Sequence, residues 1–217
     1  MSTKKPLALQ ISLVAIMAAL AFVSVLVIRI PAVMFLKYEP KDIILLLTGL
    51  IFSPATAIAA TVVSCLIELI TISSTGGLGF VMNVLASLAY VLPVCYFFAK
   101  KREHSMLLIG LAVGIVSMTG LMILWNYIVT PIFLQRPRAE IVPLLWSAIL
   151  PFNLVKAAIN SGVCLALYPI LRRSLASYEW VESAGAVELG RRKTRYLYAI
   201  GVFLILTGIL CIWAMRN

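Results

Sequence analysis

The sequence predicts an all-α integral membrane protein that crosses the bilayer with seven helices, the second of them short. Of its 217 residues, 63% are hydrophobic and 12% are charged, whereas a soluble domain is about half apolar and about a quarter charged. The apolar residues lie in long continuous runs. Strands of a membrane β-barrel would instead be short segments of alternating hydrophobicity, so the composition and the runs favour a helical bundle.

The net charge of +10 lies mostly in short segments between the apolar runs. That placement is typical of loops that set membrane topology and meet anionic lipid headgroups, so we expect these charges to serve the lipid bilayer and not nucleic acid. The four cysteines fall within apolar runs without CxxC spacing, and there is one histidine, His104. We therefore expect no metal site and no disulfide framework.

The first apolar run extends from about Leu7 to Ile30. It is longer than the apolar part of a signal peptide and lacks a small-x-small cleavage site, so we expect a retained membrane helix. Ala15 and Ala19 lie one above the other on this helix. Small residues at that spacing allow another helix to approach closely, although alanine-rich membrane helices also show the pattern by chance.

A polar connection follows the first span and extends from Arg29 to Asp42. Pro31 and Pro40 exclude a continuous helix in this connection. Asp42 is well placed to cap a helix that begins at Ile43.

Residues 43–72 would be about 45 Å long as one helix, too long for a bilayer core of about 30 Å. Ser53-Pro54 is the expected break, which leaves a short helix over residues 43–52 and a full span over residues 55–72. Basic residues precede the first span and follow the span at residues 80–99. The positive-inside rule places both basic groups in the cytoplasm, so the short helix has to cross too.

Two polar features lie near the outer ends of the third and fourth spans. We expect the Glu68 carboxylate to be solvated at the membrane interface, with a position facing a binding site as the alternative. The uncharged loop over residues 71–79 contains Gly77 and two further glycines. Its backbone can approach a ligand closely, although a flexible connector explains the composition equally well. The fourth span carries Asn83 near its outer end.

The fifth span covers about residues 106–128 and carries Asn126 at its outer end. The sixth covers about residues 141–171, and we expect Pro143 and Pro151 to break it.

The sixth span contains the most informative polar residues of the chain. Asn153, Lys156 and Asn160 are spaced i, i+3 and i+7, so they share one helix face. Amide and ammonium groups are costly inside a bilayer and usually face a cavity, a ligand or each other. Hydrogen bonds that hold neighbouring helices together are the alternative, but Lys156 has no acidic partner four residues away. A ligand site is the better interpretation.

The C-terminal part divides into a polar, basic stretch over residues 174–195 and a seventh apolar run over residues 196–215. The distribution of lysine and arginine predicts a cytoplasmic N-terminus and an extracellular C-terminus. On this topology, a group of amide and ammonium side chains lies at one depth in the outer half of the membrane, below the connection that carries Tyr38 and Glu39. The group consists of Asn83, Asn126, Asn153 and Lys156. Such a group suits a flat, polar, hydrogen-bonding ligand.

Several segments together resemble the substrate-binding S components of energy-coupling-factor (ECF) vitamin transporters, specifically the riboflavin-binding type. The similar segments are PFNLVK at residues 151–156, YEPKD at 38–42, LTGLIFSP at 47–54, TGGLG at 75–79 together with Asn83, and Asn126-Tyr127, as well as the pair Ala15 and Ala19. The resemblance covers about residues 7–173.

The resemblance implies a six-helix bundle with a short second helix that binds a vitamin in its outer half. It implies flavin contacts by Asn126, Asn153 and Lys156, with Asn83, Gly77 and the loop of Tyr38 and Glu39 nearby. Ala15 and Ala19 would face the membrane-embedded T component, which two ATPase subunits energise, and the S component would tip over in the membrane to release its ligand. No glycine-rich nucleotide-binding motif occurs in the sequence, so a partner has to hydrolyse ATP.

We therefore divide the chain into a six-span substrate-binding domain (residues 1–173), a basic cytoplasmic linker (174–195) and an additional membrane helix (196–217) that such S components typically lack. We expect a multi-pass plasma-membrane protein that takes up riboflavin or a related flavin such as FMN, needs no cofactor and is not an enzyme. Another vitamin on the same scaffold, or a membrane scaffold protein without a small ligand, are the alternatives. An intramembrane enzyme is disfavoured because Glu68 is the one acidic residue that we place inside a span.

Overall fold

The structure is a computed structural model that describes residues 6–33, 36–175 and 191–216. Most of the predicted linker therefore lies outside the described residues. The elements in chain order are α1 (Leu7–Val27), β1 (Ile30–Val33), β2 (Leu36–Tyr38), α2 (Lys41–Ile51), α3 (Pro54–Thr71), α4 (Gly76–Lys100), α5 (His104–Leu134), α6 (Arg138–Leu144), the π-helical segment η1 (Leu145–Ile149), α7 (Leu150–Ser174) and α9 (Arg191–Arg216).

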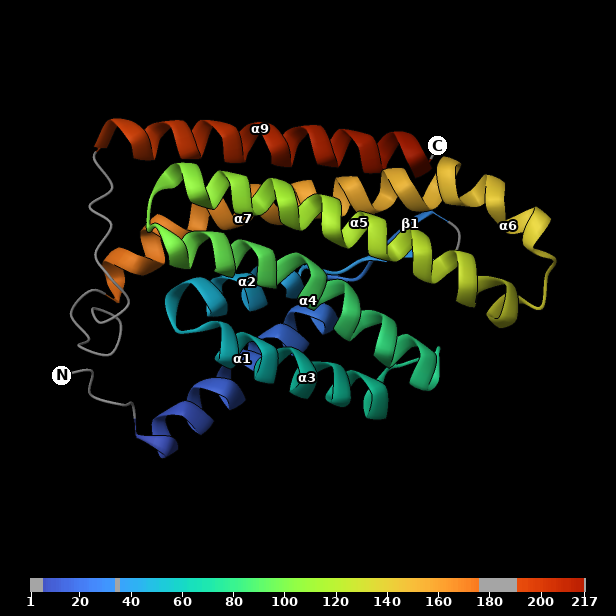
Figure 1. Cartoon of the computed structure of the whole chain (residues 1–217), viewed down its shortest axis with the longest axis horizontal. Coiled ribbons are helices and arrows are strands. Elements are labelled where there is room, and N and C mark those ends of the chain that lie inside the picture. The colour runs from blue at the N-terminus through green and yellow to red at the C-terminus, as the bar shows by residue number, and fades with distance from the viewer. Residues whose placement is uncertain (1–5, 34–35, 176–190, 217) are drawn as a thin grey trace.

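The predicted membrane-helix bundle is confirmed. Six helical segments among the described residues are long and apolar enough to cross a membrane, namely α1, α3, α4, α5, α6 to α7, and α9. The short second helix is also confirmed, because α2 has 11 residues and runs back toward the end of the molecule at which α1 begins (Figure 1). Nearly all of α2 is buried, so neighbouring helices cover this short helix.

The break between α2 and α3 has the expected cause. Ser53 is the N-cap of α3, its hydroxyl oxygen accepts a hydrogen bond from the Thr56 N–H at 3.1 Å, and Pro54 occupies the first turn. A proline at this position costs no helical hydrogen bond because the first N–H groups of a helix have no partner within it.

The connection between α1 and α2 differs from the all-α prediction. β1 and β2 pair as an antiparallel hairpin, with Ile30 opposite Tyr38 and Pro31 opposite Lys37. Pro31 does exclude a helix, as expected, but a two-stranded ribbon tolerates a proline because one edge of each strand is unpaired. The expected cap at Asp42 is wrong: α2 begins at Lys41, Pro40 is the N-cap, and the Asp42 side chain makes long-range contacts instead.

The proline breaks expected in the sixth span are replaced by a change of helix type. α6, η1 and α7 follow one another without a turn. Pro151 has no N–H to donate to the carbonyl of Ser147, and five residues of π-helix just before α7 accommodate the missing bond. The glycine-rich loop is also shorter than predicted, because α4 already begins at Gly76, where φ is +57°.

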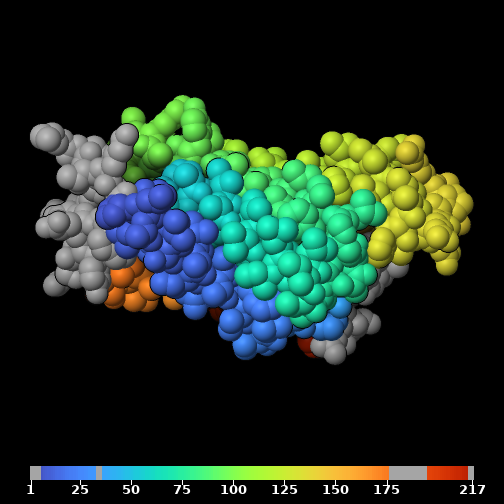
Figure 2. All heavy atoms as spheres, turned by 90° about the horizontal axis from the view of Figure 1, so that it is seen from below, coloured from blue at the N-terminus to red at the C-terminus, as the bar shows by residue number. Residues whose placement is uncertain are grey.

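The additional helix α9 packs along α7. A Cβ atom on Gly162 of α7 would lie 2.6 Å from the backbone oxygen of Gly201 on α9, so these two backbones meet at glycines. Figure 1 places α9 on the opposite side of the bundle from α1, and Figure 2 shows α1 and α3 uncovered by α9. The appended helix therefore leaves the α1 side of the bundle accessible.

Candidate functional site

A cavity of about 300 Å³ lies between the β1–β2 hairpin, α3, α4, α5 and α7. Its volume is at the lower end of the range for small-molecule sites. Its polar lining includes Arg29, Lys37, Glu39, Glu68, Ser73, Ser74, Thr75, Asn83, Asn126, Asn153 and Lys156, and its apolar lining includes Leu36, Leu69, Phe80, Met82, Met118, Met122, Phe133 and Phe152. Ligand pockets usually combine apolar surface with convergent polar groups, and this cavity has both, with polar or charged residues making up half of its lining.

The two asparagines on α5 and α7 are held by their own helices. The Asn126 amide donates to the Met122 carbonyl at 2.7 Å and its oxygen accepts from the Thr130 hydroxyl at 2.8 Å. The Asn153 amide donates to the Ile149 carbonyl at 2.7 Å. Because a carboxamide has two N–H groups and two acceptor lone pairs, each side chain keeps donor and acceptor capacity for a ligand. Their fixed orientation reduces the entropy that ligand binding would cost.

Lys156 has an acidic partner that the sequence pattern on its own helix did not indicate. Its ammonium lies 3.0 Å from the carboxylate of Asp42 on α2. Asp42 is fully buried and also accepts hydrogen bonds from Ser87 at 2.5 Å and Asn160 at 3.5 Å. Lys156 therefore lines the cavity as a hydrogen-bond donor whose positive charge is balanced by Asp42, and not as an isolated positive charge.

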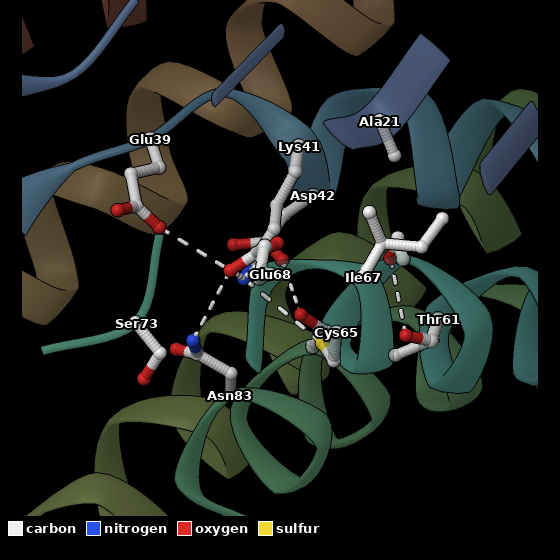
Figure 3. A network of polar contacts seen from close by, with 12 residues as sticks. Ala21, Glu39, Lys41, Asp42, Thr61, Cys65, Ile67, Glu68, Ser73 and Asn83 are labelled. Carbon is white, nitrogen blue, oxygen red and sulfur yellow. Dashed lines mark hydrogen bonds and ion pairs between the residues drawn. The ribbon is translucent and has the colours of Figure 1, made fainter. Parts of the chain in front are cut away.

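A second buried network connects the hairpin to α3 and α4 (Figure 3). The Lys41 ammonium contacts both carboxylate oxygens of Glu68 at 2.8 Å and the Glu39 carboxylate at 3.8 Å. Glu39 also pairs with Arg29 at 2.9 Å, and the Asn83 amide donates to Glu68 at 3.4 Å. The expectation that Glu68 is solvated at the interface is wrong, because the residue is 6% exposed and lines the cavity.

The acidic and basic groups of these two networks balance one another. Glu39, Asp42 and Glu68 each form an ion pair with a basic side chain, and the partners are Arg29, Lys41 and Lys156. The view that Glu68 is the one acidic residue inside a span is wrong, because Asp42 lies in α2 and is buried. The sequence argument against an enzyme relied on a single acidic residue inside the spans, and it therefore no longer holds. Each of the three carboxylates is nevertheless already paired with a basic side chain.

The structure brings five of the seven predicted substrate-binding residues to one cavity. They are Glu39, Asn83, Asn126, Asn153 and Lys156.

Two of the predicted substrate-binding residues do not line the cavity. The buried Tyr38 hydroxyl donates to Asn160 at 3.0 Å, and burial raises the pKa of Tyr38 well above its usual value, with a further contribution from Asp42. Gly77 is exposed in the first turn of α4. Tyr38 therefore supports the wall behind Lys156, and Gly77 lies on the surface of the molecule.

The predicted partner-interface pair lies on the exposed face of α1. Ala15 and Ala19 are exposed, whereas Ala18 and Ala21 pack against the core. The small residues thus divide into one face that packs within the bundle and one that remains available.

Residues missed by sequence reasoning belong to the two buried networks. Arg29, Lys41 and Asp42 belong to the segment that was predicted to be a polar connection between two helices. One signal could have identified Asp42: Lys156 requires an acidic partner somewhere in the fold, and Asp42 lies in the first turn of the short helix α2.

Comparison with known proteins identifies the family. A profile of the family described as "ECF transporter, substrate-specific component" matches residues 9–168. This chain belongs to that family. The resemblance expected from the sequence segments is thereby confirmed, and the match ends before α9 begins.

Two relatives and one solved structure are similar to this family member. "Riboflavin transporter FmnP" of Bacillus subtilis is 27% identical over 157 residues, which are 68% of this chain and 80% of that protein. "Riboflavin transporter RibU" of Streptococcus thermophilus is 26% identical over 155 residues, which are 67% of this chain and 74% of that protein. A structure described as "Structure and mechanism of the S component of a bacterial ECF transporter" aligns with a TM-score of 0.67 and 24% identity over 78% of this chain and 99% of that chain. The S-component fold is thus present in full, and the relatives are named as transporters.

Proposed function

We propose that this chain is the riboflavin-binding subunit of an ECF-type transporter and holds riboflavin in the cavity beneath the β1–β2 hairpin. The observation that carries the proposal is the convergence of Asn126, Asn153 and Lys156 on one cavity in a chain of this family. The imide edge of a flavin ring offers both donors and acceptors, which carboxamides can match. Both curated relatives are named as riboflavin transporters.

Transport requires partners on this proposal. The sequence has no nucleotide-binding motif, so a T component and two ATPase subunits would supply the energy, and Ala15 and Ala19 on α1 are the proposed contact with the T component. The N-terminus would lie in the cytoplasm and the C-terminus outside, and the hairpin and the cavity would then lie at the outer side of the plasma membrane.

Binding is tested on the full chain purified in detergent, by quenching of riboflavin fluorescence and by the visible absorption spectrum of protein from riboflavin-fed cells. Wild type should carry about one flavin per chain. Asn153→Ala and Lys156→Ala should lose it while they remain folded, and Ser147→Ala, on the exposed side of η1, should keep it. A folded wild-type protein that is colourless and does not quench riboflavin would overturn the flavin assignment.

That outcome would leave two other proposals for the same family member. Binding of a different vitamin would retain the dependence on Asn153 and Lys156. If the protein is instead a membrane scaffold without a small ligand, alanine at these two positions should lower its thermal stability. No ligand binding would be detected with wild type or variant, because the two side chains would only form contacts between helices.

A further inference from the structure

Glu68 lines the cavity but is not among the residues proposed to bind the flavin ring. It lies late in α3, lines the cavity and is 6% exposed. Its carboxylate lies on the α3 side of the cavity, whereas the two carboxamides that suit a flavin ring come from α5 and α7. The cavity therefore has two polar walls of different chemistry.

The Glu68 carboxylate has acceptor capacity beyond its contacts within the protein. A carboxylate has about four lone-pair positions. Lys41 uses one on each oxygen, both at 2.8 Å, and Asn83 donates to one oxygen at 3.4 Å. Figure 3 shows Lys41 and Asn83 approaching Glu68 from different elements. A group that lines the cavity with such capacity can bind a ligand that supplies a hydrogen-bond donor.

The chemistry of this wall selects one part of a flavin. In an ion pair with Lys41, the carboxylate accepts hydrogen bonds and donates none. Hydroxyl groups of a ligand can donate hydrogen bonds to the Glu68 carboxylate, whereas a phosphate or carboxylate of a ligand would be repelled by its negative charge. The imide edge of the flavin ring carries carbonyl acceptors next to its N–H, so it matches the carboxamides of Asn126 and Asn153 better than it matches Glu68. The ribityl chain carries several hydroxyl groups and therefore matches the Glu68 carboxylate on the α3 side of the cavity.

We propose that Glu68 is a specificity-determining residue that accepts hydrogen bonds from ligand hydroxyl groups, so that the ribityl chain lies against α3 and the flavin ring against α5 and α7. The inference rests on the proposed function, because it takes riboflavin as the ligand. Asn83 and Lys41 are positioning residues in this arrangement, since each holds the Glu68 carboxylate in place.

The test compares two flavins with the same ring. Riboflavin carries the ribityl chain and lumiflavin has a methyl group in its place. For Glu68→Gln, riboflavin affinity measured by fluorescence quenching should fall about 10- to 100-fold, as expected for loss of a hydrogen bond to a charged group. Lumiflavin affinity should change by less than about twofold, because the ring does not contact this wall.

Glu140→Gln is the matched control. Glu140 forms an exposed surface pair with Arg136, so this variant removes a carboxylate outside the cavity and should bind both flavins as wild type does. If Glu68→Gln fails to fold because Lys41 loses its partner, the double variant Lys41→Gln/Glu68→Gln replaces the ion pair with two amides. The riboflavin-to-lumiflavin affinity ratio of that variant then decides the question.

Two results would overturn the inference. An equal loss of affinity for both flavins would show that Glu68 only supports the cavity, and unchanged affinity for both would show that it does not contact the ligand. Wild-type protein that binds neither flavin is a different failure, because it contradicts the proposed function itself.

Discussion

The ammonium of Lys156 on α7 lies 3.0 Å from the carboxylate of Asp42 on α2. The pair connects the short helix α2 to the helix that carries Asn153, and Ser87 of α4 donates a hydrogen bond to the same carboxylate. Such a pair is costly to form away from water, but loss of one partner is costlier because a charge is left uncompensated. Asp42 therefore stabilises both the position of α2 and the orientation of Lys156.

Asp42→Asn should destabilise the protein strongly. We expect the free energy of unfolding to fall by about 3–5 kcal/mol, because Lys156 would keep its charge without a buried partner. Thermal unfolding in detergent measures the effect. The double variant Asp42→Asn/Lys156→Gln should recover part of the loss, since no charge remains unpaired. A double variant that is less stable than Asp42→Asn would contradict this interpretation.

FMN should bind at least about tenfold more weakly than riboflavin, because its phosphate brings a charge of about −1.5 to −2 into a cavity whose basic side chains Arg29, Lys41 and Lys156 are already paired with carboxylates. Lys37 also lines the cavity but is exposed, so water screens any contact between it and a phosphate. Competition of FMN against riboflavin fluorescence quenching gives the ratio. FMN affinity equal to that of riboflavin would contradict the prediction.

The sequence was sufficient for the bundle and for one wall of the cavity. Continuous apolar runs reveal membrane helices directly because the bilayer requires them. The spacing of Asn153 and Lys156 identified a helix face, and both residues line the cavity. In each case the information is local, since it depends on neighbours within a few turns of one helix.

Glu39 and Asn83 of the second wall were predicted, but the ion pairs of that wall were not, because their partners meet only in the folded chain. Glu68 looked like an interfacial carboxylate until Lys41 of α2 was placed beside it at 2.8 Å. Asp42 looked like a helix cap because that role depends on adjacent residues alone, whereas its pairing with Lys156 depends on how α2 packs against α7. Charged residues in short connections thus require tertiary structure for their interpretation.

Leucine at both Ala15 and Ala19 should abolish riboflavin uptake by cells while the purified variant still binds riboflavin. The two residues are exposed on α1, so larger side chains would fit the monomer but would hold another helix away. Uptake of labelled riboflavin and co-purification with the T component measure the effect. Gly120→Leu, on α5 where a Cβ meets no atom within 4 Å, is the control and should retain both. Normal uptake by the alanine-to-leucine variant would rule out this face as the partner interface.

Gly162→Ala should loosen α9 from α7. Its Cβ would lie 2.6 Å from the Gly201 backbone oxygen, and because a backbone atom cannot move aside alone, the two helices must separate. We expect a loss of about 1–3 kcal/mol, which is typical of overpacking, measured by thermal unfolding in detergent. Gly120→Ala introduces the same methyl group into open space and should leave the stability unchanged. Equal stability of the two variants would contradict the close packing of α7 and α9.

A chain that ends at Leu175 should fold and bind riboflavin within about twofold of the full-length affinity, because none of the described residues of α9 lines the cavity. The lining residues of the cavity all precede Ala157, and the family match ends at residue 168. α9 does contact β1, and β1 belongs to the hairpin beside the cavity, so faster dissociation of riboflavin from the truncated chain would reveal whether α9 steadies that hairpin. Loss of riboflavin binding by a folded truncated chain would contradict the division into a six-span binding domain and an appended helix.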